Sequence, residues 1–243
     1  MRIAHGHTGN TRSNHILAAL PDAEWRRWQS QLELVDLQFG QVLCEAGDAP
    51  RCAWFPTTAA ISLMSLTQEG ESAEMALVAN EGVVGVSLFM GGDPMTSRAM
   101  VLSAGQAYRL RAGLAIESLA QPGKIQGAVL RYAHALLSQV GQTALCNRRH
   151  SLEKQLCRRL LAGLDHLPAN ELSLTHQLVA NLLGVRREGV TAAALKLRQD
   201  GVIRYSRGHI TVLDRPRLEA RACECYAAMK NAVPCPLPMA LAA

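Results

Sequence analysis

The chain has 243 residues, of which 49% are hydrophobic and 19% charged, a composition that suits one or two globular domains. It has no run of eighteen apolar residues and no apolar stretch near its start, so we expect neither a membrane span nor a signal peptide. The seven cysteines are scattered without regular spacing, which favours a reduced, cytoplasmic protein over a disulfide framework.

The charge of the chain is distributed unevenly. Residues 1–122 contain 8 Lys and Arg against 12 Asp and Glu, whereas residues 123–243 contain 17 against 8. An acidic half followed by a basic half indicates two parts with different partners. The basic part is expected to face a polyanion such as nucleic acid.

The N-terminal half shows two patterns in succession. Residues 15–32 are amphipathic and predict a short helical segment that Pro21 interrupts. Residues 32–111 then contain many short segments rich in β-forming residues, separated by Gly, Asp, Asn and Pro. This alternation predicts an antiparallel sandwich or barrel.

A long helix is predicted after Pro122-Gly123, because apolar residues recur there at spacings of three and four over about 25 residues. We interpret this stripe as a dimer seam that pairs with a second copy of the chain. Its members are Ile125, Val129, Tyr132, Leu136 and Val140. The alternative is that the stripe packs only on its own chain.

Residues 174–212 have the pattern of a winged helix-turn-helix. Thr175 is a good N-cap for a helix over 176–183, and Gly184 follows at the position of a left-handed C-cap. A second helix is predicted from about residue 186 to residue 200. Two short strands around Arg207-Gly208 then predict a β-hairpin, the wing.

The second helix of such a motif enters the major groove, and its first turn meets the base edges. Arginine can bond guanine bidentately and glutamate can accept from cytosine, so Arg186, Arg187 and Glu188 are predicted base contacts, with Thr191 as a further candidate. A merely solvated surface is the alternative, but positive charge at this end opposes the helix dipole. Small side chains are expected to let the helix approach DNA closely; these are Gly189, Ala192 and Ala193.

Other polar residues of the motif are placed for the DNA backbone. Thr175 and His176 begin the first helix, and Arg204 and Arg207 belong to the hairpin. We expect these four residues to contact phosphates, which supply affinity without reading sequence.

The segment LTHQLVANLLGVRREGVTAAALKLRQDGVIRYSRGHITV resembles the DNA-binding domain of the Crp/Fnr family of bacterial transcription regulators, with Arg187-Glu188 at the family's base-contacting pair. The resemblance extends over nearly the whole chain. It implies an α+β fold with a cyclic-nucleotide-binding-like antiparallel β-roll (15–121), a dimerisation helix (122–149) and a winged helix-turn-helix (151–231). It also implies a homodimeric, sequence-specific transcription regulator with double-stranded DNA and RNA polymerase as partners.

The recognition helix departs from the family pattern at two positions. Ala192 stands where relatives often carry a further arginine, and Arg186 replaces the usual serine. The operator sequences of the family therefore cannot be transferred to this chain.

The sensor region departs further. In EGVVGVSLFMGGDPMTSRAMV, Gly82 and Gly85 keep the glycines of the nucleotide-binding stretch, but Val86 stands where nucleotide-binding relatives have a ribose-binding glutamate. Arg98 lies near the phosphate-binding position. We interpret these four residues as a vestigial ligand pocket and expect no cofactor, with the effector unknown. A cyclic-nucleotide- or redox-responsive regulator of the same family is the alternative.

Metal and enzyme chemistry find little support in the sequence. Iron–sulfur relatives use cysteines near the N-terminus, whereas residues 1–43 contain none. Cys223-x-Cys225, with Cys235 beyond, could bind metal or form a redox pair, but a single C-x-C is weak evidence, so we predict no metal site. A cupin-like metalloenzyme would need histidine ligands, and the β-rich region contains no histidine. We predict that the protein is not an enzyme.

Overall fold

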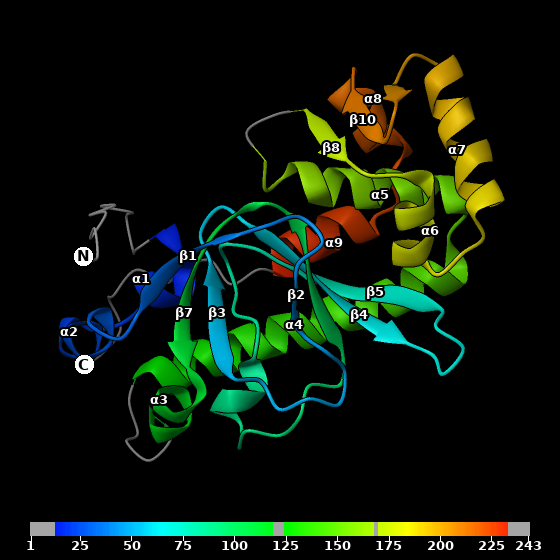
Figure 1. Ribbon diagram of the computed structural model, residues 1–243. Coiled ribbons are helices and arrows are strands. Elements are labelled where there is room, and N and C mark those ends of the chain that lie inside the picture. The colour runs from blue at the N-terminus through cyan, green and yellow to red at the C-terminus, as the bar shows by residue number, and fades with distance from the viewer. Residues whose placement is uncertain (1–12, 119–123, 168–169, 233–243) are drawn as a thin grey trace, which may run out of the picture.

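The computed structural model describes residues 13–118, 124–167 and 170–232 (Figure 1). Pro122-Gly123, the predicted boundary between residues 121 and 122, and Cys235 lie outside the described residues. None of the described helices is long and apolar enough to cross a membrane.

Two short helices, α1 (His15–Ala18) and α2 (Asp22–Gln29), precede the strands. The side chain of Asn14 caps α1 by accepting hydrogen bonds from two backbone N–H groups of its first turn. Pro21 lies directly before α2, so the predicted interruption at this proline is confirmed.

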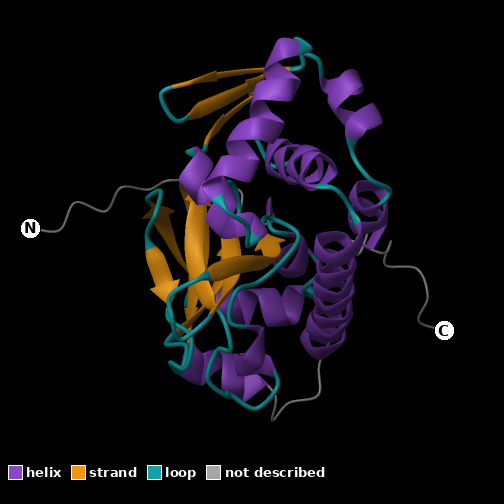
Figure 2. Cartoon of the chain, turned by 90° about the vertical axis from the view of Figure 1, so that its right-hand side faces the viewer, coloured by secondary structure: helices purple, strands orange, loops and turns teal. Residues whose placement is uncertain are grey.

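The next seven strands form two antiparallel sheets (Figures 1 and 2). The first sheet has the order β1 (Glu33–Leu37), β7 (Gly105–Arg111), β3 (Cys52–Pro56). The second has the order β2 (Val42–Cys44), β6 (Arg98–Ser103), β4 (Ala60–Leu66), β5 (Ser72–Val78). Side chains from both sheets share one hydrophobic core, in which the rings of Trp28, Phe55 and Phe89 contact one another. The predicted antiparallel β-roll is confirmed.

Helix α4 (Lys124–Arg149) has 26 residues, which confirms the predicted long helix. The short η2 (Val86–Phe89) packs on α4, and the short α3 (Ala112–Glu117) packs on η2, β3 and β7 (Figure 1).

The predicted dimer seam on α4 lies inside its own chain. Ile125, Val129 and Tyr132 are 4%, 1% and 5% exposed and belong to the core of the β-roll. Leu136 and Val140 are partly buried against the same core. The β-roll of the same chain therefore covers Ile125, Val129 and Tyr132, and only Leu136 and Val140 of the predicted seam keep some exposed surface. A 3–4 spacing identifies the apolar face of a helix but does not identify what covers that face.

The elements after α4 form a second unit with its own core. The helix α5 (Leu152–Leu164) leads into β8 (Glu171–Ser173), α6 (His176–Leu183) and α7 (Arg187–Gln199), and then β9 (Ile203–Ser206), β10 (His209–Val212), α8 (Arg215–Arg221) and α9 (Cys225–Ala232) follow. The two helices, their turn and the hairpin confirm the predicted winged helix-turn-helix. The strand β8 was not predicted; it pairs with β10 and makes the wing a three-stranded sheet.

This second unit packs directly on the β-roll (Figure 2), and its core continues into the outer face of β4 and β5. At this joint Arg159 Nε lies 2.8 Å from Glu74 Oε1, with both side chains less than 10% exposed. The contact is an ion pair without a well-aligned hydrogen bond at Nε. Ser62 donates a hydrogen bond of 2.8 Å to the other carboxylate oxygen of Glu74. A charged pair is therefore buried between the two units.

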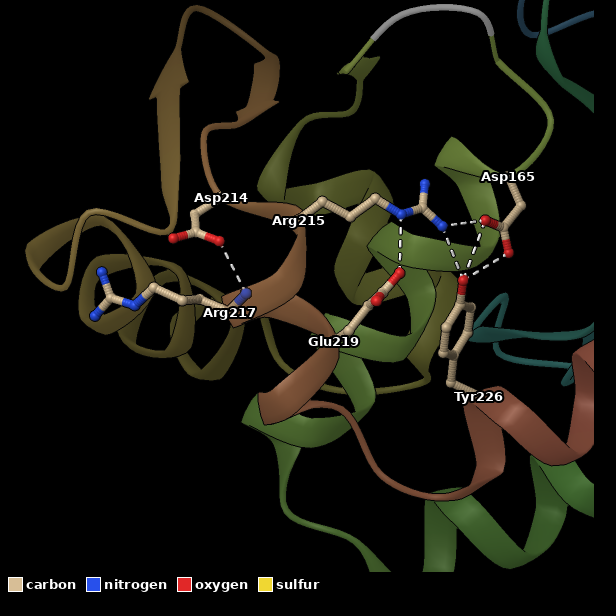
Figure 3. Close-up of polar contacts among 6 residues, drawn as sticks. All are labelled: Asp165, Asp214, Arg215, Arg217, Glu219 and Tyr226. Atoms are coloured by element: carbon tan, nitrogen blue, oxygen red, sulfur yellow. Dashed lines mark hydrogen bonds and ion pairs between the residues drawn. The ribbon is translucent and has the colours of Figure 1, made fainter.

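Helices α8 and α9 are tied to the end of α5 by a polar network (Figure 3). Arg215 pairs with Asp165 and Glu219, and the hydroxyl of Tyr226 donates to Asp165 at 2.9 Å. Burial, followed by the hydrogen bond to Asp165, raises the pKa of Tyr226 to about 12. Asp214 caps α8 by accepting from the backbone N–H of the third residue of that helix. The network holds α8 and α9 in place against α5.

Candidate functional site

The first turn of α7 carries the predicted base-contacting residues. Arg186 is the N-cap, and Arg187 and Glu188 follow; all three side chains are exposed. Helix α7 lies at the outer edge of the molecule, with α6 between it and the strands of the β-roll (Figure 1). The structure thus leaves this end of the helix open to a partner.

Thr191, one turn further along α7, is held by neighbouring groups. Its hydroxyl donates a hydrogen bond of 3.1 Å to the carbonyl of Arg187 and lies 3.0 Å from His176 Nδ1. Because the hydroxyl has only one proton, it accepts from a protonated Nδ1. The methyl group of Thr191 is therefore better placed than its hydroxyl to contact a base.

His176 joins three parts of the motif. It begins α6, contacts α7 through Thr191, and stacks on the ring of Tyr205 in β9 with centroids 4.1 Å apart. Burial, and then the charge of Arg187, lower the pKa of His176 from its ordinary value of 6.5. The residue is thus neutral near pH 7. The packing role of Tyr205 was missed in the sequence, where it is only one apolar position in a short strand.

The wing turn lies against the start of α6. Arg207 and Gly208 have φ angles of +47° and +86°, as a two-residue turn with both central residues left-handed requires. A Cβ on Gly208 would lie 3.4 Å from Thr175 Cγ2, and the hydroxyl of Thr175 caps α6 by accepting from the N–H of Leu178. The residues predicted for the DNA backbone, Thr175, His176 and Arg207, are therefore brought together. Arg204 is exposed on β9 of the same hairpin.

The charges of this surface are unpaired. Among the described residues, no ion pair is formed by the four arginines of the recognition helix and the hairpin: Arg186, Arg187, Arg204 and Arg207. Elsewhere in the unit, Lys196 binds Glu153 and Arg221 binds Asp200. The four arginines on the face formed by α7 and the wing are available to a polyanion.

One expectation for α7 was wrong. Gly189 was expected to allow close approach to DNA, but a Cβ at this position would lie 2.8 Å from Leu152 Cδ2 of α5. The glycine instead permits close packing of two helices within the unit. Ala192 is exposed, and Ala193 is partly buried.

The four residues of the predicted ligand pocket occupy different environments. Gly82 is buried against Tyr132 of α4, and Gly85 adopts a left-handed conformation with φ of +88°. Val86 begins η2 and is partly buried. Arg98 Nε lies 2.6 Å from Glu45 Oε2, so a carboxylate of the chain already occupies the arginine expected near the phosphate position.

Both units match known domain families. The model described as a cyclic nucleotide-binding domain matches residues 34–121, and the model described as a Crp-like helix-turn-helix domain matches residues 154–221. The chain belongs to the Crp/Fnr family of transcription regulators. Its helix-turn-helix implies that DNA is a partner of this Crp/Fnr regulator.

Solved structures show the same fold. A chain from Eubacterium rectale, described as a regulator of the Crp/Fnr family, has a TM-score of 0.70 at 20% identity, covering 85% of this chain and 96% of that one. The regulator TTHA1359 of that family, from Thermus thermophilus, has a TM-score of 0.62 at 21% identity, covering 78% and 98%. The regulator CLP of Xanthomonas campestris, described as responsive to c-di-GMP, has a TM-score of 0.63 at 14% identity, covering 79% and 99%. No curated protein matches the sequence of this Crp/Fnr regulator.

Proposed function

We propose that this Crp/Fnr regulator binds a specific DNA site as a homodimer and reads base edges with the first turn of α7. The observation that most directly supports base reading is that Arg186 and Arg187 are exposed and form no ion pair, beside the exposed Glu188. Thr175, Arg204 and Arg207 then bind phosphates around this turn, because they lie on the adjoining start of α6 and on the wing. His176 is proposed to contribute through its backbone N–H at the start of α6, because its neutral ring already donates its proton to Thr191. The positive charge of an arginine in the first turn is unfavourable because it lies at the positive end of the helix dipole. Phosphates bound nearby would offset that cost.

The dimer contact is proposed on the exposed face of α4. Leu130 and Leu137 are 53% and 71% exposed although both are large and apolar. Exposed residues continue this stripe at alternating spacings of four and three: Leu130, His134, Leu137, Gly141, Ala144 and Arg148. Such a period of about 3.5 is typical of a coiled-coil seam. A Cβ at Gly141 would meet nothing within 4 Å, so this position leaves room for the helix of a second copy.

The sensor is proposed to be degenerate toward cyclic nucleotides. Val86 offers no carboxylate for a ribose, and the charge of Arg98 is paired with Glu45. An effector of another kind would act through the β4–β5 side of the roll, which touches the DNA-binding unit. A cleft of about 500 Å³ lies there, lined by residues of both units, among them Phe39, Leu77, Arg159 and His209.

The parts of the chain are proposed to be the sensor (15–121), the dimerisation helix (122–149) and the DNA-binding unit (151–231). A role in transcription implies RNA polymerase as a partner and a cytoplasmic location. We infer that the protein has no catalytic activity, because regulators of this family act by binding.

Selection of bound sequences from random DNA by the purified chain tests this function. We expect a near-palindromic site whose half-sites lie roughly 34 Å apart, one helical turn. Wild-type protein that enriches no sequence over a variant with Arg187→Ala and Glu188→Ala would overturn the proposal. Enrichment of a single half-site would support base reading by α7 but would contradict the proposed dimer.

A further inference from the structure

We propose that Cys146, His150, Cys223 and Cys225 form a binding site for one zinc ion. The three sulfur atoms and the imidazole nitrogen all lie within 4.8 Å of one another. The three cysteines are buried, and the His150 side chain is 14% exposed. Three thiolates and one imidazole are a ligand set that structural zinc sites use. The sequence predicted no metal site, because the other two residues of this set, Cys146 and His150, lie about 75 residues upstream of the C-x-C pair.

The spacing of the ligand atoms fits a single tetrahedral ion. Cys146 Sγ and Cys223 Sγ are 3.6 Å apart, and Cys225 Sγ is 3.4 Å from His150 Nδ1. A tetrahedral zinc ion with ordinary bond lengths separates two sulfur atoms by about 3.8 Å and a sulfur from a nitrogen by about 3.6 Å. Small shifts would complete the site. An iron–sulfur cluster distributes its cysteines over several iron atoms and needs wider spacing.

Outer contacts of the four residues also fit a metal site. His150 Nε2 lies 3.2 Å from Glu224 Oε1, so a carboxylate orients the imidazole with Nδ1 toward the sulfur atoms. A carboxylate on the far nitrogen is common for zinc-binding histidines. Gln142 Nε2 donates a hydrogen bond of 3.0 Å to Cys225 Sγ, as suits a thiolate.

The charge of Arg158 provides an independent reason. This arginine is 5% exposed, and its Nε has no hydrogen-bond partner; no carboxylate of the described residues forms an ion pair with it. A buried charge without a counter-ion is costly. Zn²⁺ with three thiolates and a neutral imidazole carries one negative charge, which Arg158 would balance.

A disulfide explains less of this arrangement. The Cys146 and Cys223 sulfur atoms would have to close from 3.6 Å to about 2.0 Å, with an oxidant to accept two electrons. Such a bond would leave Cys225, the imidazole and its carboxylate without a role. One zinc ion uses all of them.

The site lies where α4 meets the DNA-binding unit. Cys146 lies near the end of α4 and His150 directly after it, whereas Cys223 lies between α8 and α9 and Cys225 is the first residue of α9. Helix α9 packs on both α4 and α5. Arg215 of α8 and Tyr226 of α9 also contact Asp165 at the end of α5 (Figure 3). Zinc would therefore fix the DNA-binding unit relative to α4.

Metal analysis of the full chain, purified under reducing conditions without chelator, tests the site. We expect one zinc per chain in the wild type and at least a tenfold loss in the double variant Cys223→Ser, Cys225→Ser. Cys44→Ser is the matched control, because Cys44 lies on β2 of the roll; its zinc content should stay unchanged. Bound iron, or a metal-free wild type with free thiols or a Cys146–Cys223 disulfide, would overturn the proposal.

A cobalt titration covers the case in which the double variant does not fold. Wild-type protein stripped of metal should bind one Co²⁺ and gain the intense visible bands of tetrahedral thiolate coordination. His150→Cys should bind the ion with shifted bands. A wild-type spectrum typical of octahedral, oxygen-bound cobalt would exclude the site. DNA binding enters neither experiment, so each outcome is independent of the proposed function.

Discussion

The sensor and the DNA-binding unit differ in how their functional residues are distributed along the chain. The residues proposed to read bases lie within six consecutive positions, 186–191, and the wing follows directly. In the sensor, the state of Arg98 depends on Glu45, 53 positions away. A site built from one contiguous motif can be read in the sequence, whereas a site built from strands that meet only in the fold cannot.

The two units also differ in how their charges are used. In the roll, Arg98 pairs with Glu45 and Arg109 with Glu33, whereas the exposed Arg51 and Arg111 form no ion pair with described residues. The arginines of α7 and the wing form no ion pair with described residues either, but they lie together on one face of the DNA-binding unit. What sets this unit apart is therefore the grouping of its unpaired arginines.

The largest effect is expected from breaking the proposed dimer. Glutamate at both Leu130 and Leu137 would place charges in the exposed stripe of α4, so the protein should sediment as a monomer. Affinity for the selected site should fall roughly 10³-fold, toward non-specific binding. Ile116→Glu is the control, since Ile116 is an exposed apolar residue on α3 and should leave the dimer intact. Wild-type protein that sediments as a monomer at micromolar concentration would contradict the proposal that this stripe forms the dimer contact.

The buried ion pair between the units should matter far more than the exposed pair of the sensor. Glu74→Gln leaves the charge of Arg159 buried and unpaired, which should lower the free energy of unfolding by about 3 kcal/mol. Glu45→Gln removes the partner of Arg98 and should cost less than about 1 kcal/mol, because that pair is solvent-exposed. Denaturant titration of both variants measures the difference. Equal losses of unfolding free energy in the two variants would mean that the pair of Glu74 and Arg159 is not buried between the two units.

His176 should give the DNA-binding unit a pH-dependent stability. Its lowered pKa means that the folded protein binds this proton more weakly than the unfolded chain does. Stability should therefore fall as the pH drops below 6.5, the ordinary histidine value. His176→Gln should reduce that slope, although the lost stacking on Tyr205 lowers stability at every pH. Melting temperatures between pH 5 and 8 give the two slopes, and identical slopes would contradict the assignment.

The smallest effect is expected from cyclic AMP on the wild type. With Val86 and a paired Arg98 in the sensor, calorimetry should detect no low-micromolar binding. Affinity for the selected DNA should be the same with and without the nucleotide. Tight binding that strengthens the DNA complex would show that the sensor retains a working pocket.

Local patterns predicted much of this structure. The caps Thr175 and Gly184, the break at Pro21 and the wing turn at Arg207-Gly208 lie where the sequence placed them. Local patterns could not say what covers a face, so the apolar stripe of α4 was assigned to a second copy when the β-roll covers it. Gly189 was assigned to DNA for the same reason, although it faces α5.

Long-range contacts carried no signal in the sequence. Strand β8 has three residues, too few for a period of two to show. The pairing of Glu74 with Arg159 and the approach of Cys146 to Cys223 depend on the packing of separate units. These contacts were found only in the fold.

The most direct test of the DNA-binding account is a titration of Arg187→Ala and Arg207→Ala against the selected and a scrambled DNA at several salt concentrations. Arg187→Ala should cost about 1–3 kcal/mol per half-site on the selected DNA and relax the preference at one base pair. Arg207→Ala should weaken both DNAs alike and lower the salt slope by about one unit per half-site. Equal weakening of both DNAs by Arg187→Ala, with altered base preference in Arg207→Ala, would contradict the placement of α7 in the major groove.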